Sequence, residues 1–199
     1  MNPDAVFFDL GGVILRTEHQ APREHLAERL NLSYEDLVGI VFESESARAA
    51  SLGKIPARLH WENVVGRLGR PVAEIEEIRD EFFAGDVLDR ELLDLIRSLR
   101  PACRTGLISN GWNDLRDYVV KSRFDDAFDV LVISAEVGLL KPDPGIYNLA
   151  LGELRAAADR SVMVDDTAAN IEAARAMGMS GILFEDPDQV RRDLAGLLD

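Results

Sequence analysis

Polar side chains that can do chemistry follow three short apolar runs of this 199-residue chain. Each run is rich in branched or aromatic residues, which is typical of a buried strand. A carboxylate held at the end of a strand is suited to act as a nucleophile or as a metal ligand. Aspartate and glycine are also common in turns, so each position taken alone has a plain structural alternative. The polar residues are Asp9, Ser109-Asn110 and Asp165-Asp166.

The apolar pattern divides the chain into two kinds of region. From residue 89 onward helical and strand patterns alternate, which is typical of a parallel sheet with crossover helices. Residues 16–88 show helical spacing and no strand pattern. We therefore expect an α/β fold, a Rossmann-like doubly wound parallel sheet with an inserted α-helical bundle. The core would comprise residues 1–15 and 89–199, and the bundle residues 16–88.

Individual elements can be placed within this division. The first strand should end at Asp9, and further strands are expected over 105–108, 130–133, 161–164 and 181–184. The bundle should contain about four short helices, including one over 21–30, one that begins at Ser33, one over 59–68 and one over 75–83.

The polar residues should meet in space, because the carboxyl ends of parallel strands lie on one edge of a sheet. Lys141 lies in a loop ahead of a helix and is expected at the same edge. We expect the Lys141-Pro142 bond to be cis, since proline lowers the preference for trans to about 1 kcal/mol or less and the lysine must point into the site.

The net charge limits the classes of partner. The chain has 36 acidic and 22 basic residues, a formal charge of -14. Such a charge repels nucleic acids and anionic membrane surfaces, and no run approaches the ~20 apolar residues that span a bilayer. We expect no nucleic-acid or membrane partner and a cytoplasmic location, in keeping with a single cysteine and no recognisable secretory signal. The sequence predicts no oligomeric state.

Four segments together resemble the motifs of the haloacid dehalogenase-like hydrolase superfamily. The resemblance covers essentially the whole chain, and residues 16–88 look like the small helical cap of its first subclass. Within the superfamily the chain resembles the amino-terminal phosphatase domain of soluble epoxide hydrolases and the sugar-1-phosphate phosphatases. The segments are Phe8-Asp9-Leu10-Gly11-Gly12-Val13, Leu107-Ile108-Ser109-Asn110, Gly138-Leu139-Leu140-Lys141-Pro142 and Val164-Asp165-Asp166-Thr167-Ala168-Ala169-Asn170.

The resemblance implies a Mg²⁺-dependent phosphatase that acts on a small phosphorylated metabolite. Asp9 would attack phosphorus and form an aspartyl-phosphate, which water then cleaves. Mg²⁺ prefers oxygen ligands, and the implied set is the Asp9 carboxylate, the Gly11 carbonyl and Asp166, supported by Asp165.

The remaining implied roles concern the phosphate group. The Ser109 hydroxyl, the Asn110 backbone N–H and the Lys141 ammonium would hold its oxygens, so that Asp9, Ser109 and Lys141 form the catalytic set. Asn170 would orient Lys141 or Asp166. His19 and Trp112 could approach the substrate from the side, although a surface or core position is favoured for both, as it is for Trp61.

Gly11 departs from the pattern of the superfamily's phosphatases, which usually carry a second aspartate two residues after the nucleophile. That aspartate protonates the leaving oxygen and activates water, and glycine cannot do either with a side chain. General acid–base help is typically worth ~10²- to 10⁴-fold in rate. We therefore hypothesise a leaving group that needs little protonation, as in an anomeric, acyl or aryl phosphate, or a substitute acid such as His19.

Two alternatives to a phosphatase stay open. A catalytically weak protein that binds a phosphorylated metabolite or a partner would also explain Gly11. A dehalogenase also lacks the second aspartate, but the intact Asp165-Asp166 pair argues for a retained metal.

Overall fold

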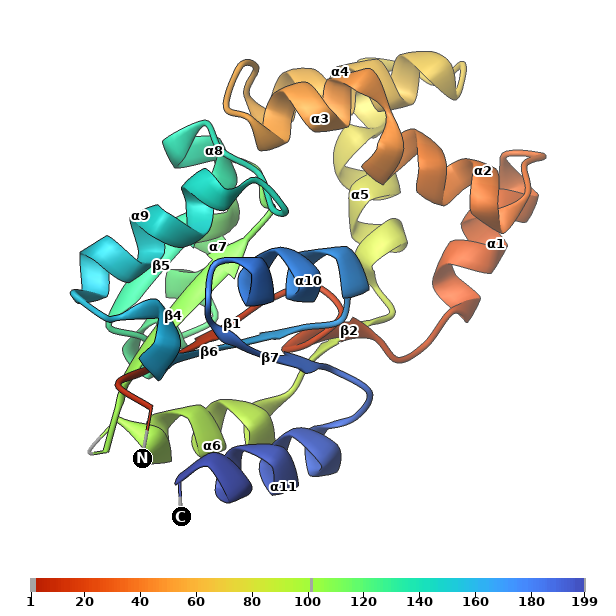
Figure 1. Cartoon of the computed structure of the whole chain (residues 1–199). Coiled ribbons are helices and arrows are strands. Elements are labelled where there is room, and N and C mark those ends of the chain that lie inside the picture. The colour runs from red at the N-terminus through yellow and green to blue at the C-terminus, as the bar shows by residue number, and fades with distance from the viewer. Residues whose placement is uncertain (1–2, 101, 199) are drawn as a thin grey trace.

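Five parallel strands form the central sheet in the computed structural model, which describes residues 3–100 and 102–198 (Figure 1). Strand β1 lies in the middle, with Phe8 opposite Leu107 on one side and Val164 on the other. The strands, in their order across the sheet, are β5 (Val130–Ile133), β4 (Arg104–Ser109), β1 (Ala5–Phe8), β6 (Ser161–Asp165) and β7 (Ser180–Leu183). This confirms the predicted Rossmann-like α/β fold, and each strand limit lies within one residue of the expected one.

Helices cover both faces of the sheet (Figure 1). Alternate residues of β1 point to opposite faces: Val6 and Phe8 join one apolar core, and Ala5 and Phe7 join the other. The first core is shared with α6 (Arg90–Leu99), α7 (Leu115–Lys121) and α11 (Pro187–Leu198), the second with α9 (Pro144–Leu154) and α10 (Ala168–Ala176). Short helical turns lie at η3 (Asp125–Ala127), α8 (Ser134–Val137) and η4 (Ala158–Arg160). Within the described residues, no helix is long and apolar enough to cross a bilayer.

Residues 18–85, called the helical segment below, have an apolar core of their own. Ser33 begins a helix as expected, since its hydroxyl accepts a hydrogen bond from the Asp36 N–H at 3.0 Å. A π-helical turn follows this helix directly. The elements are α1 (Ala21–Arg29), α2 (Tyr34–Val38), the π-helical turn η1 (Gly39–Glu43), α3 (Glu45–Ser51), α4 (Ala57–Arg67), η2 (Val72–Glu74) and α5 (Ile75–Phe83).

Two short strands connect the helical segment to the sheet. The strands β2 (Leu15–Thr17) and β3 (Asp86–Leu88) pair antiparallel, so the expectation of no strand in residues 16–88 is wrong at both ends. Each of these strands has only three residues, most of them half-buried, so neither shows an alternating pattern long enough to recognise. The ribbon is fastened by ion pairs of Arg16 with Asp89 at 3.0 Å and of Arg23 with Asp86 at 2.7 Å.

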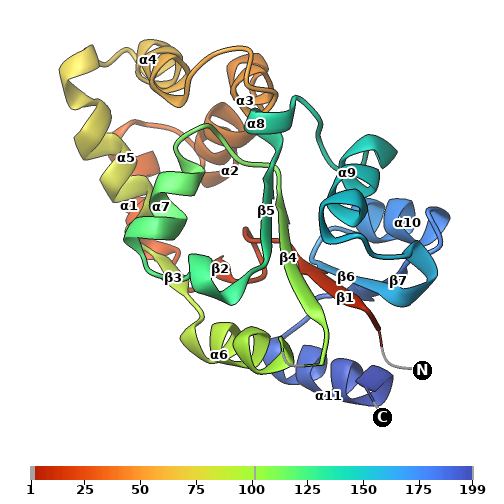
Figure 2. The same ribbon diagram turned by 90° about the vertical axis from the view of Figure 1, so that its left-hand side faces the viewer.

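The helical segment touches the sheet domain at a second place, beyond the ends of β4 and β5. The Ala57 N–H donates to the Asn113 side-chain oxygen at 2.7 Å, so a residue of the β4–α7 loop caps α4. Gly53, at a φ of 67°, passes so close to α8 that a Cβ would lie 2.1 Å from the Ala135 carbonyl oxygen. Figure 2 shows α3 and α8 side by side at this contact.

Candidate active site

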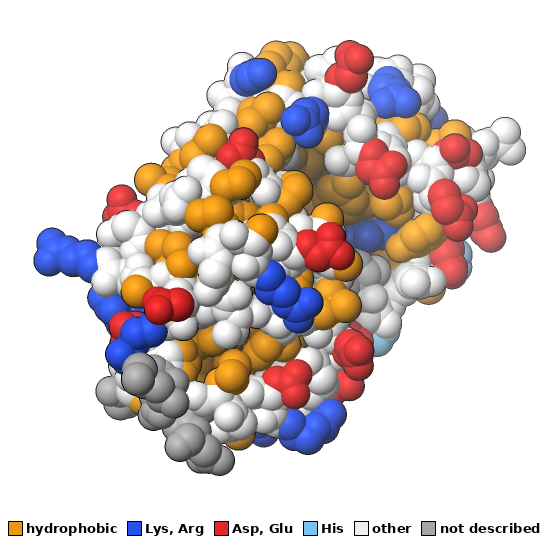
Figure 3. All heavy atoms as spheres, viewed as in Figure 1, with side chains coloured by type: hydrophobic (Ala, Val, Ile, Leu, Met, Phe, Trp, Pro, Cys, Tyr) orange, Lys and Arg blue, Asp and Glu red, His pale blue; other side chains and the backbone are white. Residues whose placement is uncertain are grey.

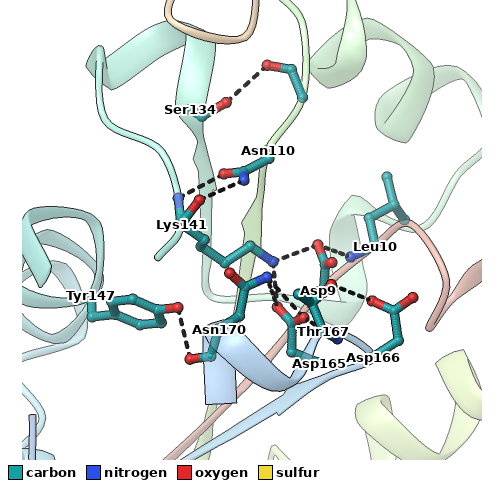
Figure 4. Close-up of polar contacts among 11 residues, drawn as sticks. Asp9, Leu10, Asn110, Ser134, Lys141, Tyr147, Asp165, Asp166, Thr167 and Asn170 are labelled. Carbon is teal, nitrogen blue, oxygen red and sulfur yellow. Dashed lines mark hydrogen bonds and ion pairs between the residues drawn. The ribbon is translucent and has the colours of Figure 1, made fainter. Parts of the chain in front are cut away.

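Lys141 lies between two aspartates at the carboxyl edge of the sheet (Figure 4). Its ammonium is 2.8 Å from Asp9 Oδ1 and 2.6 Å from Asp165 Oδ2. The lysine and Asp165 side chains are buried, and the Asp9 side chain is 13% exposed. The sheet brings Asp9 and Asp165 together because β1 and β6 are neighbours in register, as the convergence argument predicts.

Asp165 is held from several directions. Its Oδ1 accepts hydrogen bonds from the Thr167 N–H and from the Asn170 side-chain amide, both at 2.9 Å. The same amide lies 3.1 Å from Oδ2, the oxygen that also binds Lys141. Asn170 was expected to orient Lys141 or Asp166; its amide contacts Asp165, which in turn binds Lys141.

The backbone of Lys141 is held by a side chain from the neighbouring loop. The Asn110 amide donates to the Lys141 carbonyl oxygen at 2.9 Å, and its oxygen accepts from the Lys141 N–H at 2.8 Å. The Lys141-Pro142 bond is cis, as expected. Sequence reasoning assigned Asn110 only a backbone role, and this two-way side-chain contact adds a second function, that of positioning the lysine.

Asp166, in the turn between β6 and α10, approaches the loop that follows Asp9. A Cβ on Gly12, whose φ is 77°, would lie 2.0 Å from Asp166 Oδ2, so glycine is required for this approach. Asp9, Asp165 and Asp166 each offer a carboxylate oxygen, and these oxygens lie within 4.8 Å of one another. A set of hard oxygen donors at this spacing fits a divalent cation such as Mg²⁺.

Burial dominates the electrostatics of Asp9. Loss of water contact raises the pKa of its carboxyl to about 6, against the opposing effect of Lys141, and the Asp165 charge adds to the rise. The Leu10 N–H donates to Asp9 Oδ1 at 2.7 Å and favours the ionised form. For Asp166, desolvation and then the Asp165 charge raise the pKa. The site therefore concentrates negative charge that a cation would relieve.

For the other predicted residues, the structure gives burial and position in the fold. Ser109 is buried at the end of β4, beside Asp9's strand, and Gly11 is exposed in the loop after β1. His19 is exposed next to the β2–β3 ribbon. Trp61 is buried in the helical segment, and Trp112 is half-buried against the same cluster.

One residue of the site was missed by sequence reasoning. Tyr147 is fully buried in α9, and its hydroxyl donates to the Asn170 backbone oxygen at 2.9 Å. Burial and then the charges of Asp165 and Asp9 raise the pKa of this hydroxyl, so it stays a donor. The only signal was a tyrosine in an otherwise apolar helical stripe, which is equally typical of a core position.

One protein family has a sequence model that matches most of the chain. The model for haloacid dehalogenase-like hydrolases aligns with residues 3–178. The chain belongs to this family. A haloacid dehalogenase family enzyme from Bacteroides thetaiotaomicron has the same fold, with a TM-score of 0.79, 20% identity, and coverage of 93% of this chain and 95% of that one. The Bacteroides enzyme has also been crystallised with magnesium and inorganic phosphate.

Curated relatives of this hydrolase include phosphatases. The bifunctional epoxide hydrolase 2 of Rattus norvegicus is 28% identical over 94% of this chain, which spans 37% of the rat protein's length. A sesquiterpene phosphatase of Aspergillus oryzae is 26% identical, and the alignment covers 92% of this chain and 90% of that protein.

Proposed function

We propose that this haloacid dehalogenase-like hydrolase is a Mg²⁺-dependent phosphatase that cleaves a small-molecule phosphate ester or anhydride through an aspartyl-phosphate. The observation that carries the proposal is a nucleophile-type carboxylate, Asp9, held 2.8 Å from the buried Lys141 ammonium and beside Asp166. The phosphatases among its relatives, and the fold shared with an enzyme crystallised with magnesium and phosphate, support the reaction type.

Asp9 would attack through its Oδ2. Its Oδ1 is occupied by the Leu10 N–H and Lys141, which leaves Oδ2 as the attacking oxygen. This oxygen forms a bond to phosphorus, and the bond from phosphorus to the leaving oxygen breaks with its electron pair on that oxygen. Water then attacks phosphorus, the Asp9–phosphorus bond breaks, and the water's proton passes to a phosphate oxygen or to solvent.

The cation would be held by carboxylate oxygens of Asp9 and Asp166 and by the Gly11 carbonyl. Asp165 would support it at a distance, because its two oxygens already accept from Lys141, Thr167 and Asn170. When bound, Mg²⁺ supplies positive charge that offsets repulsion between carboxylate and phosphate. The Ser109 hydroxyl, the Asn110 N–H and Lys141 would hold the transferring phosphoryl oxygens.

The helical segment would act as a cap, within the predicted limits of residues 16–88. Its second contact, from Ala57 to Asn113, lies on the loop that also carries Asn110. A cap in this position would exclude water from the site and contact the leaving group.

The test is hydrolysis of 4-nitrophenyl phosphate with and without Mg²⁺. We expect turnover with Mg²⁺ and loss of at least ~10³-fold in Asp9→Asn, because the nucleophile is removed. A phosphorylated intermediate trapped on Asp9 by rapid acid quench would establish the covalent step. Release of halide from 2-chloropropionate without metal would instead favour a dehalogenase.

Gly11 favours a second candidate, a catalytically weak protein that binds phosphorylated metabolites. It predicts that phosphate stabilises the Mg²⁺-loaded protein in thermal unfolding while turnover equals that of Asp9→Asn. Turnover clearly above that control would reject this candidate.

A further inference from the structure

Three partly exposed aromatic side chains line the boundary between the helical segment and the loop after β4. We call Phe42, Phe83 and Trp112 the aromatic wall. The Phe42 ring stacks on Trp112 at a centroid distance of 6.2 Å and an angle of 30°, and it meets Phe83 edge-on at 6.1 Å. Phe42 is 45% exposed, whereas the neighbouring rings of Trp61 and Phe82 are buried.

Phe42 lies in the π-helical turn η1 and faces outward. In η1, Val41 is fully buried while the next residue, Phe42, is exposed. A π-helical turn shifts the direction of side chains relative to an α-helix and is often found at functional sites. Behind the wall, Trp61 and Phe82 are buried and contact its rings edge-on.

The aromatic wall begins next to the phosphate end of the site. Trp112 is two residues beyond Asn110, so their Cα atoms are at most about 7 Å apart. The Asn110 side chain binds both the backbone N–H and the carbonyl oxygen of Lys141. Figure 3 shows a hollow lined largely by hydrophobic side chains between the helical segment and the rest of the molecule.

Arg23, a cation that lies against the rings of Phe42 and Phe83, is already paired with a carboxylate. The Arg23 guanidinium lies 4.3 Å from the Phe82 ring centroid, but it binds Asp86 at 2.7 Å and the Phe82 carbonyl oxygen at 2.9 Å. A polar leaving group would lose water at the rings without gaining partners there, whereas an aromatic ring gains stacking contacts.

Gly11 independently restricts the leaving group. It brings no side-chain acid to the loop after Asp9, so an expelled oxygen of high pKa would leave as an unprotonated alkoxide. A phenol, with a pKa of about 10, is a far better anionic leaving group than an alkyl alcohol. Apart from Gly11 and its two chain neighbours, no described residue has an atom within 4 Å of the position that a Gly11 Cβ would take, so an acid fits there sterically.

Resting on the proposed function, we propose that the substrate is an aryl phosphate, whose ring stacks against the aromatic wall and departs as a phenolate. The Asp9 oxygen bonds to phosphorus, the phosphorus–phenolate bond breaks with its electron pair on the phenolate oxygen, and the phenolate takes its proton from solvent after release.

The test compares four substrates with Mg²⁺: phenyl phosphate, cyclohexyl phosphate, glucose 1-phosphate and acetyl phosphate. Phenyl phosphate should have the highest kcat/KM of the three esters, at least ~10²-fold above cyclohexyl phosphate. Gly11→Asp should raise the rate for cyclohexyl phosphate by ~10²-fold or more and that for phenyl phosphate much less.

The aromatic wall is tested with Phe42→Ala and the control Leu59→Ala, which removes an apolar side chain of similar exposure from the outer groove of α4. Phe42→Ala should lower kcat/KM for phenyl phosphate by about 3- to 10-fold more than for acetyl phosphate, which has no ring. Leu59→Ala should change neither value.

The outcomes separate this inference from the proposed function. Three results would overturn the aryl phosphate as substrate while leaving the protein a phosphatase. They are faster hydrolysis of glucose 1-phosphate than of phenyl phosphate, equal rate gains from Gly11→Asp on all esters, and equal losses of kcat/KM in Phe42→Ala on phenyl phosphate and acetyl phosphate. Hydrolysis of none of the four by folded, Mg²⁺-loaded protein would overturn both.

Discussion

The carboxyl edge of the sheet and the helical segment differ in how their buried polar side chains are partnered. At the edge, Lys141, Asp165 and Asn170 form a network of contacts between 2.6 and 3.1 Å. In the helical segment, the buried ring atoms His60 Nε2 and Trp61 Nε1 have no hydrogen-bond partner among the described residues. Directional charged contacts fix the geometry of the first region, whereas the second is held by apolar packing that tolerates changes of side chain.

His60 illustrates the second region. It is fully buried, and burial lowers its pKa, so the ring stays neutral. Its Nδ1 lies 2.9 Å from the Ser46 hydroxyl, and its ring centroid is 4.6 Å from that of Trp112. A neutral histidine among aromatic rings contributes packing rather than charge, in contrast to Lys141 at the sheet edge.

The largest expected effect comes from removing the charge at the centre of the sheet edge. Lys141→Met leaves Asp9 and the fully buried Asp165 without their cation, and we expect a loss of about 3–5 kcal/mol in the free energy of unfolding at pH 8 in EDTA. Urea denaturation measures it. Partial recovery on adding Mg²⁺ is also expected, and a change below about 1 kcal/mol would mean that the network is not fixed by this lysine.

A smaller, opposite effect is expected for Asp9→Asn. Because the folded pKa of about 6 lies above the ordinary 3.8, Asp9 stabilises the fold when protonated, and this contribution is lost as pH rises from about 4 through 6. In EDTA the free energy of unfolding of the variant should therefore rise relative to that of the wild type over this range. The difference should reach about 2–3 kcal/mol at pH 8.

Thermal unfolding of both proteins between pH 4 and 8 checks this prediction. Mg²⁺ should reduce the difference at pH 8 by binding the wild type more tightly. Parallel stability curves in EDTA would show that the ionisation of Asp9 does not oppose folding.

The smallest expected effect concerns the contact between the two regions. Asn113→Ala removes the acceptor of the Ala57 N–H, and helix α4 has no other side-chain cap because Pro56 occupies the N-cap. We expect a cost of about 1 kcal/mol and faster amide exchange in the first turn of α4. Asn113→Asp keeps the acceptor and should retain slow exchange. If exchange in α4 is unchanged in Asn113→Ala, this contact does not hold the helical segment.

The same contrast explains what the sequence could predict. Strands β1 and β6 contain continuous apolar runs that lead into an aspartate. The fold and the meeting of Asp9, Lys141 and Asp165 therefore followed from local pattern and parallel topology. The partner of Asn170 was beyond such reasoning, because choosing between three neighbouring polar groups requires side-chain directions.

The helical segment was predictable only as a class of structure. The three-residue strands β2 and β3 are too short to show alternation, and the π-helical turn over Gly39–Glu43 has no residue signal that marks it in the sequence. Trp112 belongs by sequence to the sheet's loops and by contact to the helical segment's core. Long-range packing therefore decides the surface that would meet a substrate.

The antiparallel ribbon of β2 and β3 has an evolutionary consequence. Since Thr17 is paired with Asp86, the helical segment begins and ends at points roughly 5 Å apart. An insert whose two ends nearly coincide can be lengthened, shortened or exchanged while the strands on either side keep their register. The ribbon thus makes the helical segment a replaceable module beside an unchanged sheet edge.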